Sequence, residues 1–263
     1  MMALFILKLV TGVTLMWWLM PRRDVTDGFF RIQMRIVLGL LVLIPLCLTA
    51  DGTWPQAVEV SEQQSQFNQE LVIGTRGLCV AGAFVSYAGS VFWALGRRTP
   101  GNICVHLLTL ICCTMLALHS FNVPNSAGAV QQLLSDFASA GVLGGVLTGM
   151  LLGHWYLTTP TMSIEPLWWF NRAILFAAVL RMAVSCWALV GSGLVETTTE
   201  QIWLTLRWVG GVLTPILSCL LVWRILKHRN TQSATGVLFA GLILVFMGEM
   251  TASLLERDTM IPY

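Results

Sequence analysis

Residues 136–160 of the chain read D-F-A-S-A-G-V-L-G-G-V-L-T-G-M-L-L-G-H-W-Y-L-T-T-P. This stretch is long and apolar enough to cross a bilayer as one helix. Four glycines recur at every fourth position in it: Gly141, Gly145, Gly149 and Gly153. On a helix this spacing forms one stripe without side chains, where a neighbour can approach the backbone closely. The stripe predicts close packing against another helix, or against a flat ring such as a porphyrin or a quinone.

The composition indicates a single integral membrane domain over residues 1–263. The chain is 56% hydrophobic and only 11% charged, against roughly 25% charged residues in soluble domains. Its mean hydropathy is +0.75. A net charge of +2 without any run of basic residues argues against a nucleic-acid partner. The seven cysteines lie in apolar segments and none forms C-x-x-C, so a zinc or iron–sulfur site within this chain is not expected.

The fold class that follows is all-α, with eight transmembrane helices. Eight apolar segments are long enough to cross a bilayer, and they cover about 2–20, 33–50, 70–95, 102–121, 134–157, 168–191, 203–225 and 234–255. Arginine and lysine gather at alternate connections, whereas the intervening loops 51–69, 122–133 and 192–202 contain neither residue. Because basic loops stay on the inner side, both termini are predicted to face outside. Tryptophans at the segment ends agree with this placement.

Several ionisable residues fall inside the predicted spans, where charge is costly and often marks function. Glu249 lies about 22 Å into the last span from the inner side, at ~1.5 Å per residue. His119 is similarly deep, and Arg76, Asp136 and Arg207 lie near outer ends, so all five share the outer half of the membrane. One hypothesis is a quinol pocket, in which Glu249 and His119 handle protons while Arg76 or Arg207 polarises a carbonyl.

The alternative for the same residues is structural. Buried ion pairs, for example Arg76–Glu249 and Asp136–Arg207, would lock helices together without any chemistry. Arg181 lies nearer the middle of its span and belongs to neither pair.

Two histidines suggest a haem site near the inner side. His106 opens the fourth predicted span and His154 closes the fifth, so they lie at similar depth on consecutive antiparallel helices. Low-spin haem b takes one imidazole from each side, and Gly149 and Gly153 would leave room for the ring. An interfacial His-Trp-Tyr at 154–156 explains the same residues without a metal.

The chain resembles the NrfD-type family, the eight-span membrane anchors of dimethyl-sulfoxide and polysulfide reductases. The residues that carry the resemblance are G-G-V-L-T-G-M-L-L-G at 144–153 and F-M-G-E-M at 246–250. The resemblance implies a haem-free, quinol-oxidising anchor in a bacterial inner membrane. It also implies that an iron–sulfur or cytochrome subunit and a catalytic subunit are separate chains.

These observations favour a membrane subunit of a redox complex that exchanges electrons and protons with the quinone pool. A transporter for a small solute or ion is the alternative, since the same buried charges would form its transport site. Transporters commonly show broken helices or repeated halves, and neither is evident in the sequence, which favours the redox hypothesis. A structural subunit without chemistry is the third hypothesis. Soluble-type catalysis is not expected, because no phosphate loop, G-x-S-x-G or H-E-x-x-H motif occurs.

Overall fold

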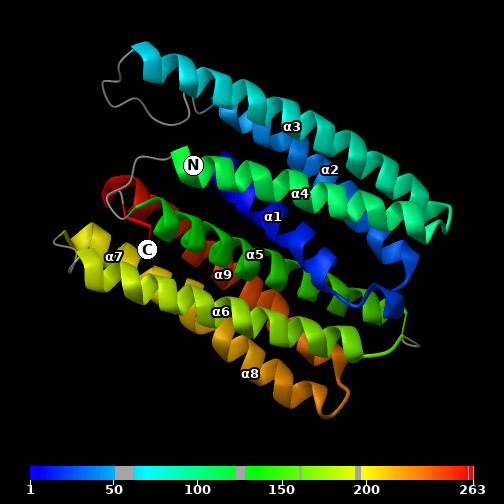
Figure 1. Cartoon of the computed structure of the whole chain (residues 1–263). Helices are drawn as coiled ribbons and strands as arrows, with labels where there is room; N and C mark the ends of the chain where they lie inside the picture. The colour runs from blue at the N-terminus through cyan, green and yellow to red at the C-terminus, as the bar shows by residue number, and fades with distance from the viewer. Residues whose placement is uncertain (51–61, 123–127, 160–161, 193–196, 260, 263) are drawn as a thin grey trace.

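The computed structural model describes residues 1–50, 62–122, 128–159, 162–192, 197–259 and 261–262, and these ranges form a helical bundle without strands (Figure 1). Eight of its helical segments are long and apolar enough to cross a membrane. The prediction of an all-α chain with eight apolar spans is therefore confirmed, and the chain is an integral membrane protein by length and composition of its helices.

The helices have the following bounds: α1 Met2–Leu19, η1 Arg22–Asp24, α2 Asp27–Ala50, α3 Glu62–Ala94, α4 Arg98–Asn122, α5 Ala129–Thr158, α6 Glu165–Ser192, α7 Thr198–Leu206, η2 Arg207–Leu213, α8 Thr214–Leu226 and α9 Thr231–Thr259. Each predicted span overlaps one of these helices, except that the seventh is divided among α7, η2 and α8. Most helices begin several residues before the predicted spans. Hydropathy marks the segment that lies in hydrocarbon, whereas the helix itself continues into the polar interface.

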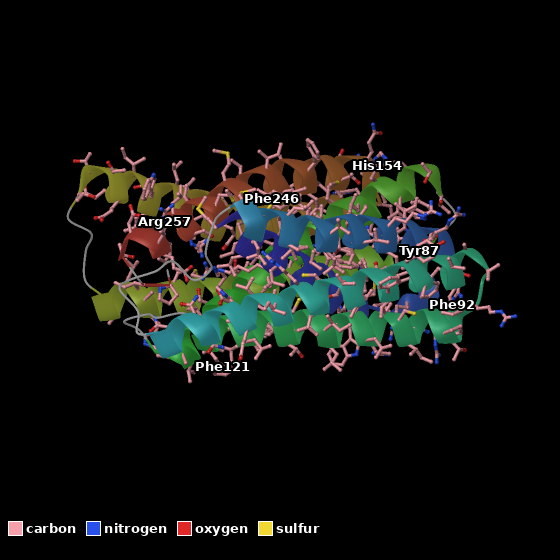
Figure 2. The ribbon with its side chains drawn as sticks, turned by 90° about the horizontal axis from the view of Figure 1, so that it is seen from above. Tyr87, Phe92, Phe121, His154, Phe246 and Arg257 are labelled. Atoms are coloured by element: carbon pink, nitrogen blue, oxygen red, sulfur yellow. The ribbon has the colours of Figure 1, made fainter. Side chains whose placement is uncertain are left out.

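Helices α1 and α5 form the interior of the bundle. Helix α5 packs against α1, α4, α6 and α9, while α2 and α3 pair at one side and α8 lies at the other (Figure 1). Both termini lie at the same end of the bundle, as an even number of crossings requires. The outward faces carry large exposed apolar side chains that suit a lipid environment, for example Phe176 and Val190. Phe121, labelled in Figure 2, is another.

The glycines mark the places where helices touch backbone to backbone. A Cβ atom added at Gly144 would overlap the backbone of Gly12, so α1 and α5 cross in direct contact. The stripe predicted on α5 faces other helices: Gly145 and Gly149 lie against Ile174 of α6. The neighbours that approach the stripe are therefore helices, as the first of the two sequence-based alternatives requires.

The seventh span contains a π-helical segment, η2, at Arg207–Leu213. The hydroxyl of Thr214 donates to the carbonyl of Val209, five residues earlier, at 2.8 Å. Opposite η2, Gly248 of α9 contacts the backbone of Gly210 and Gly211 so closely that no Cβ would fit. The seventh span, Thr198–Leu226, therefore stays one continuous helical path, and the first residue of its π-helical segment, Arg207, pairs with the buried Glu249.

Candidate functional site

Glu249 of α9 is the centre of a buried ion-pair cluster. Arg181 of α6 donates from Nε to Oε1 and from Nη2 to Oε2, both at 3.2 Å. Arg207 of η2 donates from Nη1 to Oε1 at 2.8 Å, and the hydroxyl of Ser139 on α5 donates to Oε2 at 2.5 Å. The three charged side chains are each at most 2% exposed. One carboxylate therefore joins α5, α6, η2 and α9.

The outer nitrogens of the two arginines are held by serines. Arg181 donates from Nη1 to the Ser135 hydroxyl at 2.6 Å, and Arg207 donates from Nη2 to the Ser185 hydroxyl at 3.1 Å. Nε of Arg207 is buried and has no hydrogen-bond acceptor within the described residues. A buried donor without an acceptor costs free energy, and functional sites are a common reason for one to persist.

A second cluster, which we call the outer cluster, lies toward the end of the bundle that holds both termini, and the cluster around Glu249 is called the inner cluster. Lys8 of α1 contacts Oδ1 of Asp136 at 2.8 Å and Oε2 of Glu256 at 3.9 Å. Gln132 donates from Nε2 to both oxygens of Asp136 at 3.3 Å and to Oε1 of Glu256 at 2.6 Å. The hydroxyl of Ser120 on α4 donates to Oδ2 of Asp136 at 2.6 Å. Asp136 is fully buried, whereas the Glu256 side chain keeps 17% of its surface exposed.

The two clusters are joined by one face of α5. Gln132, Ser135, Asp136 and Ser139 are spaced at three, four and seven residues from the first, which places them on the same side of the helix. Glu249 and Glu256 are seven residues apart on α9, about 10 Å along its axis at ~1.5 Å per residue. We call the two clusters together the polar file, and its members are Arg181, Arg207, Glu249, Ser135, Ser139, Asp136, Gln132, Ser120, Lys8 and Glu256.

The charges of the polar file balance as a whole but not within each cluster. The inner cluster holds two arginines and one carboxylate, and the outer cluster holds one lysine and two carboxylates. With every group ionised, the inner cluster carries +1 and the outer cluster −1. The arginines of the inner cluster are donors that can bind an acceptor atom, and buried carboxylates and hydroxyls of the kind found in both clusters can carry protons.

Of the five residues predicted for the quinol pocket, the structure brings three into the polar file, places His119 beside it and leaves Arg76 apart. Glu249, Arg207 and Asp136 belong to the polar file. His119 is buried on α4, next to the Ser120 that binds Asp136. Arg76 is exposed on α3 and does not reach the file.

The two ion pairs suggested from depth alone are replaced by others. Glu249 pairs with Arg181 and Arg207 rather than with Arg76, and Asp136 pairs with Lys8. Sequence reasoning missed Lys8 and Glu256, and left Arg181 outside the site. A usable signal existed in the seven-residue spacing of Glu249 and Glu256, which puts both on one helix face.

The two histidines considered for haem do not fit that group. His106 is exposed on α4, with its ring edge-on to Trp18 at 6.5 Å between centroids. His154 is also exposed and lies at the edge of the bundle (Figure 2). Space that a porphyrin would need beside Gly149 and Gly153 is occupied by Ile174 and by Thr235 of α9. The interior of this chain therefore does not enclose a haem between the two imidazoles.

Metal ligands are otherwise scarce in the part of the chain that the structure describes. It contains no group of three or more His, Cys, Asp or Glu side chains that could hold a metal ion. Neither His106 nor His154 therefore belongs to a group of three or more possible metal ligands among the described residues.

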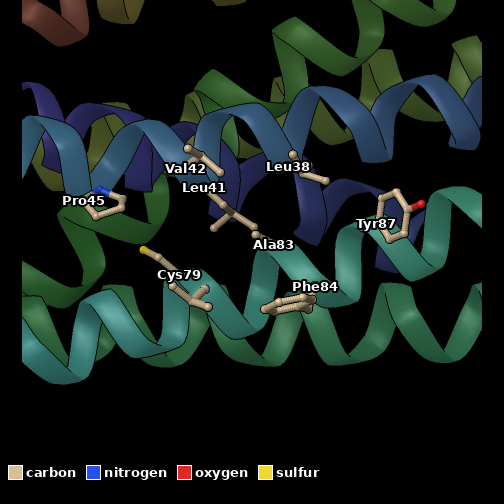
Figure 3. Close-up of a pocket in the computed structure, with 9 residues that line it drawn as sticks. Leu38, Leu41, Val42, Pro45, Cys79, Ala83, Phe84 and Tyr87 are labelled. Atoms are coloured by element: carbon tan, nitrogen blue, oxygen red, sulfur yellow. The ribbon is translucent and has the colours of Figure 1, made fainter.

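An apolar groove of about 340 Å³ opens on the lipid-facing side between α2 and α3 (Figure 3). Val42, Phe84 and Tyr87 line it and are exposed. Its lining contains no charged residue, so it suits an acyl chain or an isoprenoid tail rather than a polar substrate. The remaining lining residues are Leu38, Leu41, Pro45, Cys79, Val80 and Ala83.

No protein-family model, curated protein or solved structure matches this chain. The fold and the polar file define its class as a polytopic helical membrane protein with a buried network of ionisable side chains.

Proposed function

We propose that the chain is the membrane subunit of a redox complex that exchanges electrons and protons with the quinone pool at the polar file. The observation that carries the proposal is the buried, unpartnered Nε–H of Arg207 beside the Glu249 carboxylate, at the inner end of the polar file that leads outward to Glu256. A quinone oxygen is an acceptor that such a donor can bind.

Stability alone is a poor explanation for this network. Buried ion pairs are often no better for stability than apolar residues of the same volume, because desolvation offsets their attraction. Six ionisable side chains, from α1, α5, α6, η2 and α9, nevertheless converge here. Ionisable residues inside membrane bundles commonly mark substrate or proton pathways.

The chemistry assigns distinct roles to the two clusters. Oxidation of a quinol to a quinone releases two electrons and two protons. Arg207 would donate a hydrogen bond to a quinol oxygen, while Glu249 and Arg181 hold its guanidinium in place. The protons would leave through Ser139 and Asp136 to Glu256, and the electrons would pass to an iron–sulfur or cytochrome centre on a partner subunit.

Two arginines facing one carboxylate change the role first expected for Glu249. The paired guanidinium groups stabilise its ionised form by direct Coulomb attraction in a medium of low dielectric constant. Glu249 therefore orients the arginines, and proton transfer falls to the Asp136–Glu256 end of the polar file. His119 lies beside that end and is a second candidate proton carrier.

The proposed setting is a bacterial inner membrane with both termini outside. Arginines at 22, 23, 97, 98, 224 and 229 lie at the end of the bundle opposite the termini, which supports this orientation through the positive-inside rule. The polar file then opens toward the outer face. The resemblance of residues 144–153 and 246–250 to NrfD-type anchors supports the proposed redox function in a bacterial inner membrane. It also supports partner subunits that supply the redox centres.

A transporter is the second candidate, and the π-helical segment η2 favours it. Single π-helical turns inside helices occur frequently at functional sites, and η2 places Arg207 beside Glu249. With an excess of one positive charge, the inner cluster would recognise a small anion.

Purification of the tagged full chain from its native membranes separates the two candidates. The redox proposal predicts that iron–sulfur or cytochrome subunits accompany the chain, and that added quinol reduces their centres. A chain that purifies alone, and that carries an anion into liposomes in a manner dependent on Arg207, would overturn the redox proposal in favour of transport.

A further inference from the structure

The apolar groove between α2 and α3 follows the two helices for about two turns (Figure 3). On α2 its lining extends from Leu38 to Pro45, which is about 10 Å along the axis at ~1.5 Å per residue. Leu41 and Cys79 are the buried members of the lining. Tyr87 of α3 lies at the same end as Leu38, and Pro45 lies at the other end (Figure 3). The groove therefore has the shape and polarity to hold part of an extended hydrocarbon chain.

Two arginines continue the face of α2 that lines this groove. Five residues spaced by four, three, four and three positions share one side of the helix: Arg31, Arg35, Leu38, Val42 and Pro45. Both arginines are exposed, at the end of the bundle opposite the two termini (Figure 1). Since the apolar segment begins at about residue 33, they lie near the boundary between hydrocarbon and headgroups.

Arg35 is held across the seam between the two helices. Its Nε donates to the hydroxyl of Ser90 on α3 at 3.2 Å, and Ser90 is three residues beyond Tyr87. The guanidinium thus lies about one turn past the end of the groove, and this bond leaves both of its Nη atoms for another acceptor. Tyr87 directs its hydroxyl away from Pro45, toward the same end (Figure 3). Guanidinium and hydroxyl donors of this kind suit a phosphate.

No carboxylate among the described residues forms an ion pair with Arg31 or Arg35. Asp27, the one acid in the α2 sequence, pairs with Arg98 at 2.8 Å. The basic end of the groove therefore keeps an excess of positive charge. Basic sites between membrane helices on the inner side bind anionic lipid headgroups.

We propose that the groove binds an anionic phospholipid, with one acyl chain between α2 and α3 and the phosphate at Arg31 and Arg35. Helices α2 and α3 are the least buried of the eight candidate spans, so a lipid that contacts both would hold this pair together. A quinone tail suits the groove less well, because a quinone headgroup is uncharged. Its reacting position at Arg207 also belongs to the opposite side of the bundle, next to α8 (Figure 1). The proposal is thus independent of the quinone reaction.

Lipid titration of the purified full chain in detergent tests the proposal, with native mass spectrometry to count bound lipids. Phosphatidylglycerol is the anionic probe, and phosphatidylcholine with the same acyl chains is the zwitterionic one. Each basic residue near an anionic headgroup gives about a fivefold gain in affinity, so Arg31→Gln combined with Arg35→Gln should weaken the first phosphatidylglycerol site roughly 25-fold. Arg172→Gln combined with Arg224→Gln is the matched control, because it removes two exposed arginines at the same end of the bundle, on α6 and α8. This control should leave the first site unchanged.

A second pair of variants tests the place of the acyl chain. Val80 lines the groove and is exposed, so Val80→Trp fills the groove while both arginines stay in place. This variant should lose the first bound phosphatidylglycerol. Leu217→Trp, at an exposed position on α8, is its control and should retain the lipid.

The wild-type protein keeps the proposal falsifiable even if a variant does not fold. Equal affinity for phosphatidylglycerol and phosphatidylcholine overturns it, since the groove would then take any bilayer lipid. An unchanged first site in the folded double arginine variant, or in folded Val80→Trp, overturns it as well. An isoprenoid lipid that co-purifies in the groove and resists phosphatidylglycerol assigns the groove to a quinone tail instead. Because the titration involves no redox step, this proposal can fail while the quinone proposal stands, and the reverse.

Discussion

Replacement of Glu249 by alanine should be among the most destabilising single changes in this chain. The substitution removes the anion that binds Arg181 through two hydrogen bonds and Arg207 through one. Two guanidinium groups, each at most 2% exposed, would then face each other without a counter-charge. Removal of one partner from a buried ion pair costs about 3–5 kcal/mol. We expect a loss of unfolding free energy in that range for Glu249→Ala.

The same argument predicts that removing all three charges together is far less harmful. The triple variant Arg181→Met, Arg207→Met, Glu249→Leu leaves no unpaired charge, and apolar replacements of buried ion pairs are often neutral or stabilising, by up to about 4 kcal/mol. Its stability should therefore lie well above that of Glu249→Ala. Glu70→Ala, at an exposed position on α3, is the single-residue control, with an expected change within about 0.5 kcal/mol.

Unfolding by sodium dodecyl sulfate in mixed micelles measures these differences, and the 11 tryptophans provide the fluorescence signal. A Glu249→Ala variant within about 1 kcal/mol of wild type would refute the reasoning, because it would mean that the two arginines are not paired through this carboxylate. A triple variant as unstable as Glu249→Ala would also contradict it.

Two further predictions concern packing and orientation. Gly144→Ala should lower the free energy of unfolding by about 3 kcal/mol or more, because the added Cβ would overlap the backbone of Gly12. The control Gly236→Ala, whose Cβ would meet nothing within 4 Å, should raise it by about 0.5–1 kcal/mol in the same micelle assay. Equal effects of the two substitutions would contradict the close crossing of α1 and α5. For orientation, a Cys-free background carrying Thr198→Cys should react with an impermeant maleimide on intact cells, and one carrying Asp24→Cys only after permeabilisation. Labelling of Asp24→Cys on intact cells would reverse the proposed orientation.

The sequence predicts the spans well because hydropathy and loop charge are local properties. Eight apolar segments and the alternation of basic loops are visible without any knowledge of packing, and each segment corresponds to a helical region of the structure. The glycine spacing on α5 likewise predicts a face of close approach, although it does not tell which helix approaches.

The partners within the site could not be predicted, because depth in the membrane does not fix rotation about the helix axis. Arg76 lies at a depth similar to that of the file, yet its face of α3 turns outward. Lys8 was missed for the opposite reason: it is a single charge in the apolar α1, and its partner Asp136 is distant in the chain. The π-helical turn at Arg207 has no local sequence pattern beyond Gly210-Gly211, and the residue that these glycines meet, Gly248, is distant in the chain.

The most direct test of the quinone proposal is the effect of Arg207→Gln on quinol oxidation by the purified native complex. The variant removes the buried Nε–H and the charge, and the loss of a hydrogen bond from a charged group corresponds to about 1.5–3 kcal/mol, or roughly ten- to 150-fold. We predict a fall of that size in kcat/KM for quinol, while Arg76→Gln, at an exposed arginine in the same half of the membrane, leaves it unchanged. Equal quinol oxidation by wild type and a folded, assembled Arg207→Gln complex would contradict the account.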